Sequence, residues 1–152
     1  MDAFEHALRH EVAVGTVLTG ADIPERCLSD WMSSAPRSFV RALVRPGTTA
    51  EVSALLRLCH AHRVPVVPQG RLPGLAGGAQ PVPGCVLLSL ERMKAIEEID
   101  PAASSITVQA GVTLQQVQEA AQAQDLFFAL DLGGRGSCTI GGNLSTNAGG
   151  NR

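Results

Sequence analysis

Residues 138–150 read Cys138-Thr139-Ile140-Gly141-Gly142-Asn143-Leu144-Ser145-Thr146-Asn147-Ala148-Gly149-Gly150. Four glycines, two asparagines and several small hydroxyl residues leave few side chains that could fill a hydrophobic core. Glycine lets the backbone approach a neighbouring group closely, and successive backbone N–H groups can form a concave anion site. The composition therefore predicts a loop whose backbone comes close to another chemical group and offers it hydrogen-bond donors.

A second glycine-rich segment, residues 68–78, follows the apolar run Val64-Pro65-Val66-Val67 and reads Pro68-Gln69-Gly70-Arg71-Leu72-Pro73-Gly74-Leu75-Ala76-Gly77-Gly78. Two such loops would suit a ligand with two phosphates, or with one phosphate and a further polar part. By composition alone, tight turns explain the glycines better, because glycine clusters commonly mark turns. Neither loop contains the Gly-x-Gly-x-x-Gly or Gly-x-x-x-x-Gly-Lys-Ser/Thr fingerprint, which argues against an ordinary Rossmann or P-loop site.

Between and before these loops, the chain predicts alternating helices and strands. We expect helices over residues 2–10, from 48 onward and over 114–124, strands at 39–44, 64–67, 85–90, 95–99 and 105–109, and a connecting segment over 19–36. The helix from residue 48 begins at a capping box, Thr48-x-x-Glu51. Its apolar stripe consists of Val52, Leu55, Leu56 and Cys59. This pattern predicts a mixed fold of helices and strands, and the strand prolines favour an edge position for residues 64–67.

Composition narrows the classes of partner. Twelve basic and fourteen acidic side chains give a net charge of −2, which argues against nucleic-acid partners, as does an aromatic content of 3%. No apolar run reaches the roughly 20 residues that cross a bilayer, and the N-terminus has no signal pattern, so we expect a cytoplasmic protein that reaches a membrane only through partners.

The cysteines are widely spaced and predict four reduced, buried thiols: Cys27, Cys59, Cys85 and Cys138. Consecutive helical positions point in different directions, which argues against a metal site at Cys59-His60-Ala61-His62.

A set of motifs resembles, in order along the chain, those of one flavoprotein family. The motifs are Pro65-Val66-Val67-Pro68-Gln69-Gly70 with Gly74-Leu75-Ala76-Gly77-Gly78, Val86-Leu87-Leu88-Ser89-Leu90-Glu91-Arg92-Met93, Val108-Gln109-Ala110-Gly111-Val112, Cys138-Thr139-Ile140-Gly141-Gly142 and Thr146-Asn147-Ala148-Gly149-Gly150. The sequence is similar to FAD-linked oxidases with a PCMH-type (vanillyl-alcohol-oxidase-like) flavin domain, and most similar to the branch of D-lactate dehydrogenases and glycolate oxidase D-subunits. The resemblance runs from about Pro36 to Arg152 and favours a cofactor over simple turns.

This resemblance implies an α+β, PCMH-type FAD-binding fold, of which the chain would hold the first βαβ subdomain and the start of the second. It divides the chain into an N-terminal helix with connecting segment, residues 1–35, and the N-terminal part of the FAD-binding domain, residues 36–152. In the family the two loops wrap the FAD pyrophosphate. By motif, the FAD-binding residues are Pro68, Gly70, Arg71, Gly74, Leu75, Asp131, Gly134, Cys138, Thr139, Gly141, Gly142, Asn143, Thr146, Asn147 and Gly149. The first loop has no histidine for a covalent flavin link, so non-covalent FAD is expected.

The family's chemistry is hydride transfer from the α-carbon of a 2-hydroxy acid, of the D-lactate or glycolate type, to the flavin. Complete relatives are several times longer, and the residues that hold the flavin ring, bind the substrate carboxylate and act as base belong to the part that follows position 152. No residue of this chain is therefore assigned a catalytic role. We expect the chain to lack turnover by itself, and to act on a small-molecule 2-hydroxy acid only when a further segment or subunit completes it.

One departure from the family pattern keeps other hypotheses open. Where the family loop carries Gly-Gly-Thr or close to it, this chain has Arg71-Leu72-Pro73. Proline lacks an N–H, and larger side chains are strained wherever the loop needs φ above zero, although Arg71 could pair with a phosphate. The alternative is a degenerate, non-catalytic remnant or binding module that no longer holds FAD tightly. A third hypothesis is a protein that binds the phosphate of another nucleotide, but the sequence contains neither of the two standard fingerprints.

Overall fold

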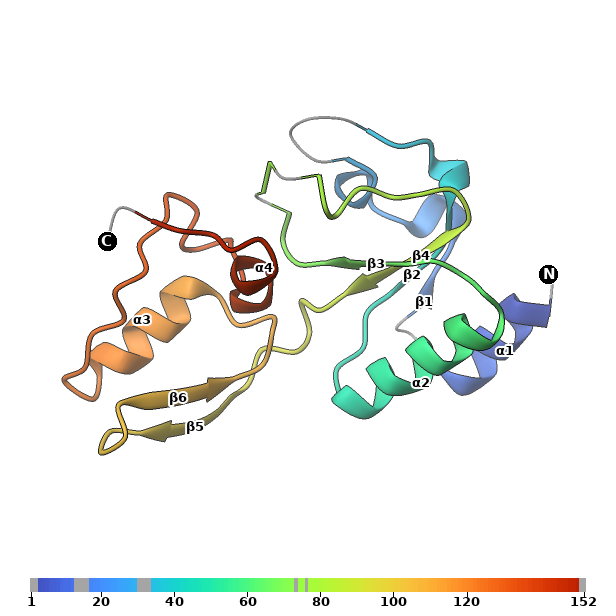
Figure 1. Ribbon diagram of the computed structural model, residues 1–152. Coiled ribbons are helices and arrows are strands. Elements are labelled where there is room, and N and C mark those ends of the chain that lie inside the picture. The colour runs from blue at the N-terminus through green and yellow to red at the C-terminus, as the bar shows by residue number, and fades with distance from the viewer. Residues whose placement is uncertain (1–2, 13–16, 30–33, 73, 76, 151–152) are drawn as a thin grey trace. The chain divides into compact units, whose positions relative to one another are not determined.

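The computed structural model describes residues 3–12, 17–29, 34–72, 74–75 and 77–150 (Figure 1). Two compact units make up the chain, Met1–Arg92 and Met93–Arg152. Each unit has its own sheet.

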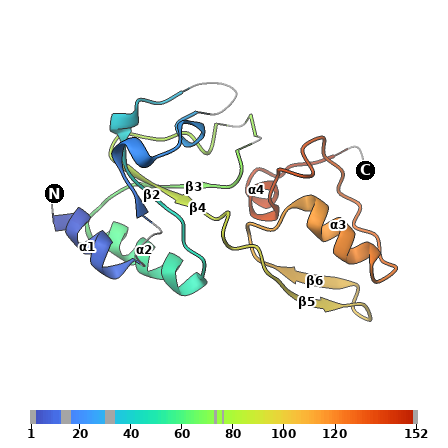
Figure 2. The ribbon, with the colours of Figure 1, turned by 180° about the vertical axis from the view of Figure 1, so that it is seen from behind.

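The first unit contains a four-stranded sheet in the order β1-β2-β4-β3, formed by β1 Val17–Leu18, β2 Val40–Val44, β4 Cys85–Ser89 and β3 Val66–Gln69. Strand β1 is antiparallel to β2, whereas β2, β4 and β3 are mutually parallel. The predicted βαβ unit is confirmed, because α2, Thr49–Ala61, connects β2 to β3 (Figures 1 and 2). Pro68 falls in β3, at the sheet edge, where its missing N–H costs no ladder bond.

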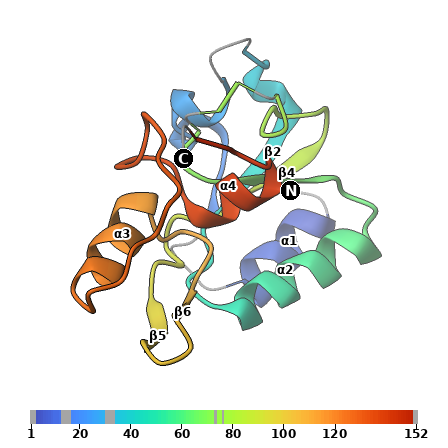
Figure 3. The same cartoon turned by 60° about the vertical axis from the view of Figure 1, so that its left-hand side comes forward.

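Side chains of the central strand alternate between two cores. Every residue of β4 is buried, as expected for a parallel strand that is covered on both faces. Val86 and Leu88 pack with helix α1, Ala3–Glu11, and with α2, which lie side by side (Figure 3). Cys85 and Leu87 pack on the other face, beneath the segment that carries the short 3-10 helices η1 Gly20–Asp22 and η2 Glu25–Cys27. A third such helix, η3 Arg37–Phe39, leads into β2.

The second unit is a two-stranded sheet followed by two helices. Strand β5, Ile96–Asp100, pairs antiparallel with β6, Ser105–Val108. Helix α3, Leu114–Gln122, follows β6, and α4, Ile140–Ser145, lies near the end of the chain. The inward face of α3 consists of Leu114, Val117 and Ala121, as the sequence predicted.

Two local predictions differ from the structure. In α2 the stripe included Leu56, which is 44% exposed, and omitted Leu58, which is buried in the first core. The capping box at Thr48 is half formed: the Thr48 hydroxyl accepts from Glu51 N–H at 3.2 Å, but the Glu51 carboxylate accepts from Gly47 N–H at 2.7 Å instead of from Thr48. A complete capping box stands at the start of α3, between Thr113 and Gln116, where the sequence analysis placed none.

The four cysteines are buried thiols without disulfide partners, as predicted from their spacing. Burial raises the pKa of Cys59 to about 11 and raises that of Cys27 and Cys85 in the same direction. Across the ranges that the structure describes, no helix has the length and apolar character needed to cross a membrane.

Candidate functional site

The carboxyl ends of the three parallel strands bring several sequence segments to one edge of the first sheet. Val44 of β2 pairs with Leu88 of β4, and Gln69 of β3 pairs with Ser89. Arg45, Gly70 and Leu90 therefore follow the three strands at the same level. In open α/β sheets this carboxyl edge is where ligands bind.

An ion-pair cluster lies at this edge. The Glu91 carboxylate accepts two hydrogen bonds from Arg26, at 2.8 and 3.0 Å, and a second guanidinium, that of Arg45, lies 4.0 Å away. The hydrogen bond from Arg26 is the main reason that the pKa of Glu91 lies below its usual value, and the charges of Arg26, Arg45 and Arg71 act in the same direction. One carboxylate thus lies beside two guanidinium groups, those of Arg26 and Arg45, and the charge of Arg71 acts on it as well. The excess positive charge favours an anion at the carboxyl edge.

The first glycine loop starts at this edge. A Cβ added at Gly74 or Gly78 would meet no atom within 4 Å, so packing within the protein does not require glycine there. Gly77 has a φ of 75°, a left-handed conformation that glycine adopts without strain. The loop's glycines therefore leave backbone open toward its surroundings, which fits a ligand that the backbone approaches closely.

The strain expected for a larger side chain in the first loop is present at Leu72, which adopts a φ of 64°. A side chain in this left-handed region is strained by about 1–2 kcal/mol. The neighbouring Pro73 lies outside the described residues. The departure from the family pattern therefore has a structural cost at position 72.

Two buried polar atoms in the described part of the chain have no hydrogen-bond partner, and both lie at the carboxyl edge. They are the Nε of Arg45, directly after β2, and the Oε1 of Gln69, at the end of β3. Buried polar groups are nearly always satisfied, so such atoms call for a physical reason. An added ligand or a rearranged loop at this edge would supply the missing partners.

The middle of the glycine-asparagine stretch near the C-terminus, Ile140–Ser145, is a short helix, and the prediction of a loop was wrong for these residues. Gly141 and Gly142 lie inside α4. Ile140 N–H donates to Val112 O at 2.9 Å and Gly141 N–H donates to Ala110 O at 2.9 Å. Tertiary contacts with these two carbonyls therefore occupy N–H groups that the sequence analysis expected to be available to a ligand.

The end of α4 is a Schellman motif. Asn147 has a φ of 49°, its N–H donates to Leu144 O at 3.2 Å, and Ala148 N–H donates to Asn143 O at 2.8 Å. These are the two bonds that define the motif, and asparagine tolerates the left-handed position. Asn147 and the carbonyl of Asn143 thus have a structural role that needs no ligand.

The glycines that follow differ in what they allow. A Cβ at Gly150 would lie 2.0 Å from the carbonyl oxygen of Asp131, whereas a Cβ at Gly149 would meet nothing within 4 Å. Packing thus requires glycine at position 150. Of the two, only Gly149 offers open backbone.

The structure gathers the predicted site residues into two groups, one in each unit. Those of the first unit lie at the end of β3 and in the loop after it: Pro68, Gly70, Arg71, Gly74 and Leu75. Those of the second unit lie before α4, within it and at its C-terminal end: Asp131, Gly134, Cys138, Thr139, Gly141, Gly142, Asn143, Thr146, Asn147 and Gly149. Arg26, Arg45, Gln69 and Glu91 were not predicted from the sequence. The available signal was a polar residue at or just after a strand end, for Arg45 after β2, Gln69 at the end of β3 and Glu91 two residues after β4.

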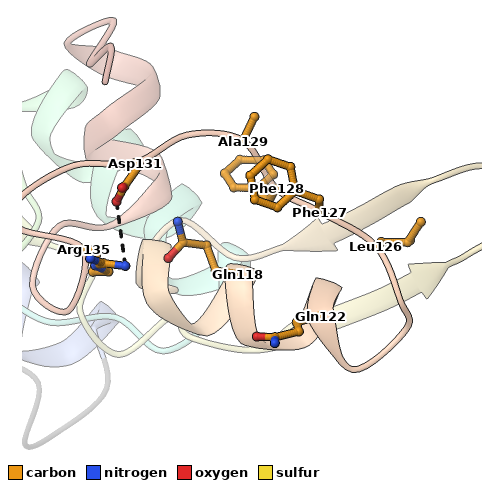
Figure 4. Close-up of a pocket in the computed structure, with 8 residues that line it drawn as sticks. All are labelled: Gln118, Gln122, Leu126, Phe127, Phe128, Ala129, Asp131 and Arg135. Carbon is orange, nitrogen blue, oxygen red and sulfur yellow. Dashed lines mark ion pairs between the residues drawn. The ribbon is translucent and has the colours of Figure 1, made fainter. Parts of the chain in front are cut away.

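The second unit also carries a pocket of about 440 Å³ (Figure 4). Gln118 and Gln122 of α3 face it together with the segment after the helix; its lining is Gln118, Gln122, Leu126, Phe127, Phe128, Ala129, Asp131 and Arg135. Phe127 is 74% exposed, and Asp131 lies 3.9 Å from Arg135. Among the described residues, no group of three or more His, Cys, Asp and Glu side chains could hold a metal ion.

Comparison with known proteins shows the family to which the chain belongs. A family model described as an FAD binding domain matches residues 40–152. The mitochondrial D-2-hydroxyglutarate dehydrogenase of Rattus norvegicus is 38% identical over 138 residues, which are 91% of this chain and 26% of that protein. The D-lactate dehydrogenase of Anaerostipes hadrus is 37% identical over 142 residues, 93% of this chain and 30% of that protein. The chain thus spans a quarter to a third of the length of these curated relatives.

Solved structures show the same fold at lower identity. One structure of alkyldihydroxyacetonephosphate synthase superposes with a TM-score of 0.82, at 20% identity, over 99% of this chain and 29% of that one. A structure of p-cresol methylhydroxylase with bound substrate gives a TM-score of 0.78, at 23% identity, over 93% of this chain and 29% of that one. The α+β architecture expected from the sequence is therefore confirmed as that of PCMH-type flavin domains, of which the chain covers a part.

Proposed function

The chain belongs to the FAD-binding domain family, whose model it matches over residues 40–152, and on this premise we propose that it is the FAD-binding portion of a flavin-dependent dehydrogenase that oxidises a 2-hydroxy acid. The similarity to D-2-hydroxyglutarate and D-lactate dehydrogenases over more than nine-tenths of the chain carries this proposal. Both names describe substrates with a hydroxyl group next to a carboxylate. The substrate class is therefore a D-2-hydroxy acid.

In this function the chain's task is to bind and orient FAD. The open backbone at Gly74 and Gly78, together with the guanidinium groups of Arg26, Arg45 and Arg71, would hold the anionic pyrophosphate at the carboxyl edge of the first sheet. When bound, the flavin supplies the acceptor for the hydride of the substrate's α-carbon.

No residue of the chain is proposed as the base or as the group that binds the substrate carboxylate. Its histidines lie on α1 and at the end of α2, at positions 6, 10, 60 and 62. All four are exposed; the rings of His6 and His10 contact each other, and His62, the C-cap residue of α2, packs edge-on against Phe4. Turnover is therefore proposed for the chain only in combination with a further segment or subunit.

A second candidate function is a binding module that no longer holds FAD tightly. The left-handed Leu72 favours it, because a strained side chain stands where the family loop carries glycine. The two candidates differ in a measurable affinity.

The deciding experiment is a titration of the purified chain with FAD, followed by the change in flavin fluorescence, with riboflavin as the matched ligand that lacks phosphates. We expect FAD to bind and riboflavin to bind far more weakly, because the proposed contacts are made to the pyrophosphate. Equal affinity for both flavins would contradict the proposed site. No binding of FAD by the natural chain, but binding after Arg71-Leu72-Pro73 is replaced by Gly-Gly-Thr, would establish the degenerate module.

The activity needs a second test. The chain, extended by any sequence that the downstream DNA encodes in frame, is assayed with D-lactate, glycolate and D-2-hydroxyglutarate and a dye as electron acceptor. We expect a yellow protein that reduces the dye with one of these acids. A colourless extended protein would contradict the dehydrogenase function.

A further inference from the structure

Gln69 is a buried polar side chain at the entrance of the first glycine loop. It is the last residue of β3 and only 3% exposed. Its side-chain Nε2 donates to Cys27 O at 3.0 Å and to Ala79 O at 2.9 Å. Cys27 belongs to η2 and Ala79 lies beyond the glycine loop, so one amide joins three segments that are far apart in sequence.

The bond to Ala79 closes the loop. Residues 70–78 lie between the two partners, so the Gln69 side chain holds the two ends of the loop together. Each end of the loop has a backbone bond of its own: Leu90 N–H donates to Gln69 O at 3.0 Å, and Gln80 N–H donates to Gly77 O at 3.1 Å. Of these bonds, that of the Gln69 side chain joins one end to the other. At Gly74, Gly77 and Gly78 a side chain would meet nothing within 4 Å, so packing does not fix the loop at these positions.

The orientation of the amide is determined by its partners. Both side-chain N–H groups face carbonyl oxygens, and a flipped amide would place Oε1 against the same two carbonyls. In the observed orientation Oε1 is buried without a partner. A buried methionine would fill a similar volume without an unsatisfied acceptor, so the two donor bonds are what glutamine contributes at this position.

We propose that Gln69 is a positioning residue, which closes the first glycine loop by tying Ala79 and η2 to the end of β3. The expected consequence is tighter FAD binding, and this part of the inference rests on the proposed function. A loop that is already closed loses less conformational freedom when the cofactor binds. Gln69 itself need not contact the cofactor. Its effect is exerted through the backbone of the loop.

The test compares Gln69→Met, which keeps the volume and removes both donors, with Val67→Ala as a matched control. Val67 lies two residues earlier in β3 and is buried in the core, so its truncation destabilises the same strand without touching either hydrogen bond. Hydrogen exchange of the Gln80 amide is measured on the full chain without flavin, and FAD affinity is measured by fluorescence titration. Gln109→Met, on the surface of the second unit, controls for the loss of a glutamine side chain.

We expect Gln69→Met to speed hydrogen exchange of the Gln80 amide and to weaken FAD binding by about fivefold to tenfold. The two control variants should leave FAD affinity unchanged, and should speed exchange at Gln80 only as far as they lower the global stability of the chain. If Gln69→Met and Val67→Ala have the same exchange at Gln80, the closing role is wrong. If exchange rises but FAD affinity does not change, the positioning role toward the cofactor is wrong, although the proposed function stands. A wild-type chain that does not bind FAD overturns the proposed function and the positioning role toward the cofactor, whereas the exchange measurement still decides whether Gln69 closes the loop.

Discussion

Gly141 donates its N–H to the carbonyl of Ala110 at 2.9 Å, and a Cβ at Gly141 would lie 2.7 Å from the Cβ of Ala110. The first turn of α4 thus lies directly on the segment that connects β6 to α3. This contact is possible only without a side chain at position 141. The glycine is therefore required by the packing of the second unit, whether or not a cofactor is bound there.

Replacing Gly141 by alanine should destabilise the second unit. Alanine has a higher helix propensity than glycine by about 1 kcal/mol, but a steric overlap in a packed contact costs typically about 1–3 kcal/mol. We expect the overlap to prevail, because the nearest atoms include the backbone of Ala110, which cannot rotate away. The measurement is urea unfolding followed by circular dichroism.

Gly142→Ala is the matched control in the same helix. Its Cβ would come no closer than 3.3 Å, to the hydroxyl of Thr139, which a small rotation can move away. This variant should be as stable as the natural chain or slightly more stable. If Gly141→Ala and Gly142→Ala unfold at the same urea concentration, the contact with Ala110 does not constrain the helix.

Leu72→Gly should relieve strain in the first loop. Leu72 has a φ of 64°, and its left-handed conformation costs about 1–2 kcal/mol relative to glycine. Part of this gain is offset, because glycine also increases the entropy of the unfolded chain by about 0.4–1 kcal/mol. We therefore expect a small rise in melting temperature and a higher affinity for FAD in the fluorescence titration.

Ser104→Gly separates these two effects. Ser104 also has a positive φ, 50°, but it lies in the turn between β5 and β6. The Ser104→Gly variant should raise the melting temperature in a similar way without changing FAD affinity. A Leu72→Gly variant with unchanged affinity would show that strain at position 72 does not limit cofactor binding.

Sequence reasoning located the first loop correctly but misread the second, and the difference has a physical cause. The apolar periodicity of β4 and α3 reflects local burial, which a sequence displays directly. Helix α4 has glycine at two of its first three positions and forms because the carbonyls of Val112 and Ala110, some thirty residues away, accept its first N–H groups. A contact of this kind leaves no periodic pattern.

The same limit applies to the polar residues of the candidate site. Arg26 and Glu91 are 65 residues apart in sequence, and only the strand order β2-β4-β3 brings the segment of Glu91 to the edge where Arg26 lies. The motif resemblance supplied Gly70 and Gly74 because backbone loops are recognisable by their glycines. Side-chain networks such as that of Gln69 depend on the folded arrangement and could not be predicted.

The ion pair of Glu91 should make stability depend on pH in the acid range. Its side chain is 12% exposed, and its pKa in the folded protein lies below the usual value, chiefly because of the hydrogen bond from Arg26. A carboxyl group whose pKa is lowered by folding stabilises the folded protein at pH values above its unfolded-state pKa, which is about 4.3. This stabilisation is lost as the pH falls through the folded-state pKa. We expect the free energy of unfolding to decrease over this interval, as measured by urea unfolding at successive pH values.

Glu91→Gln should remove this part of the dependence and should already be less stable at neutral pH. Glu98→Gln, at an exposed position of β5, removes a carboxylate elsewhere and should leave the dependence intact. If Glu91→Gln and the natural chain lose stability in parallel as the pH falls, the pair with Arg26 does not contribute.

The buried thiols provide a separate report on each unit. Cys27, Cys59 and Cys85 lie in the first unit and Cys138 in the second, and all four are buried. Burial hinders access by a reagent, and the pKa of about 11 for Cys59 leaves little thiolate at pH 8. A thiol reagent such as dithionitrobenzoate should therefore modify none of them quickly in the native chain and all of them in denaturant.

The order of modification then tests whether the two units open independently. Gly141→Ala weakens only the second unit, so at a low urea concentration one thiol, that of Cys138, should react before the other three. Adding Cys138→Ser to this variant should abolish the early phase and leave the late phase unchanged. If the four thiols of Gly141→Ala react together, the two units unfold as one cooperative structure. In that case the steric overlap in the second unit lowers the stability of the first unit as well.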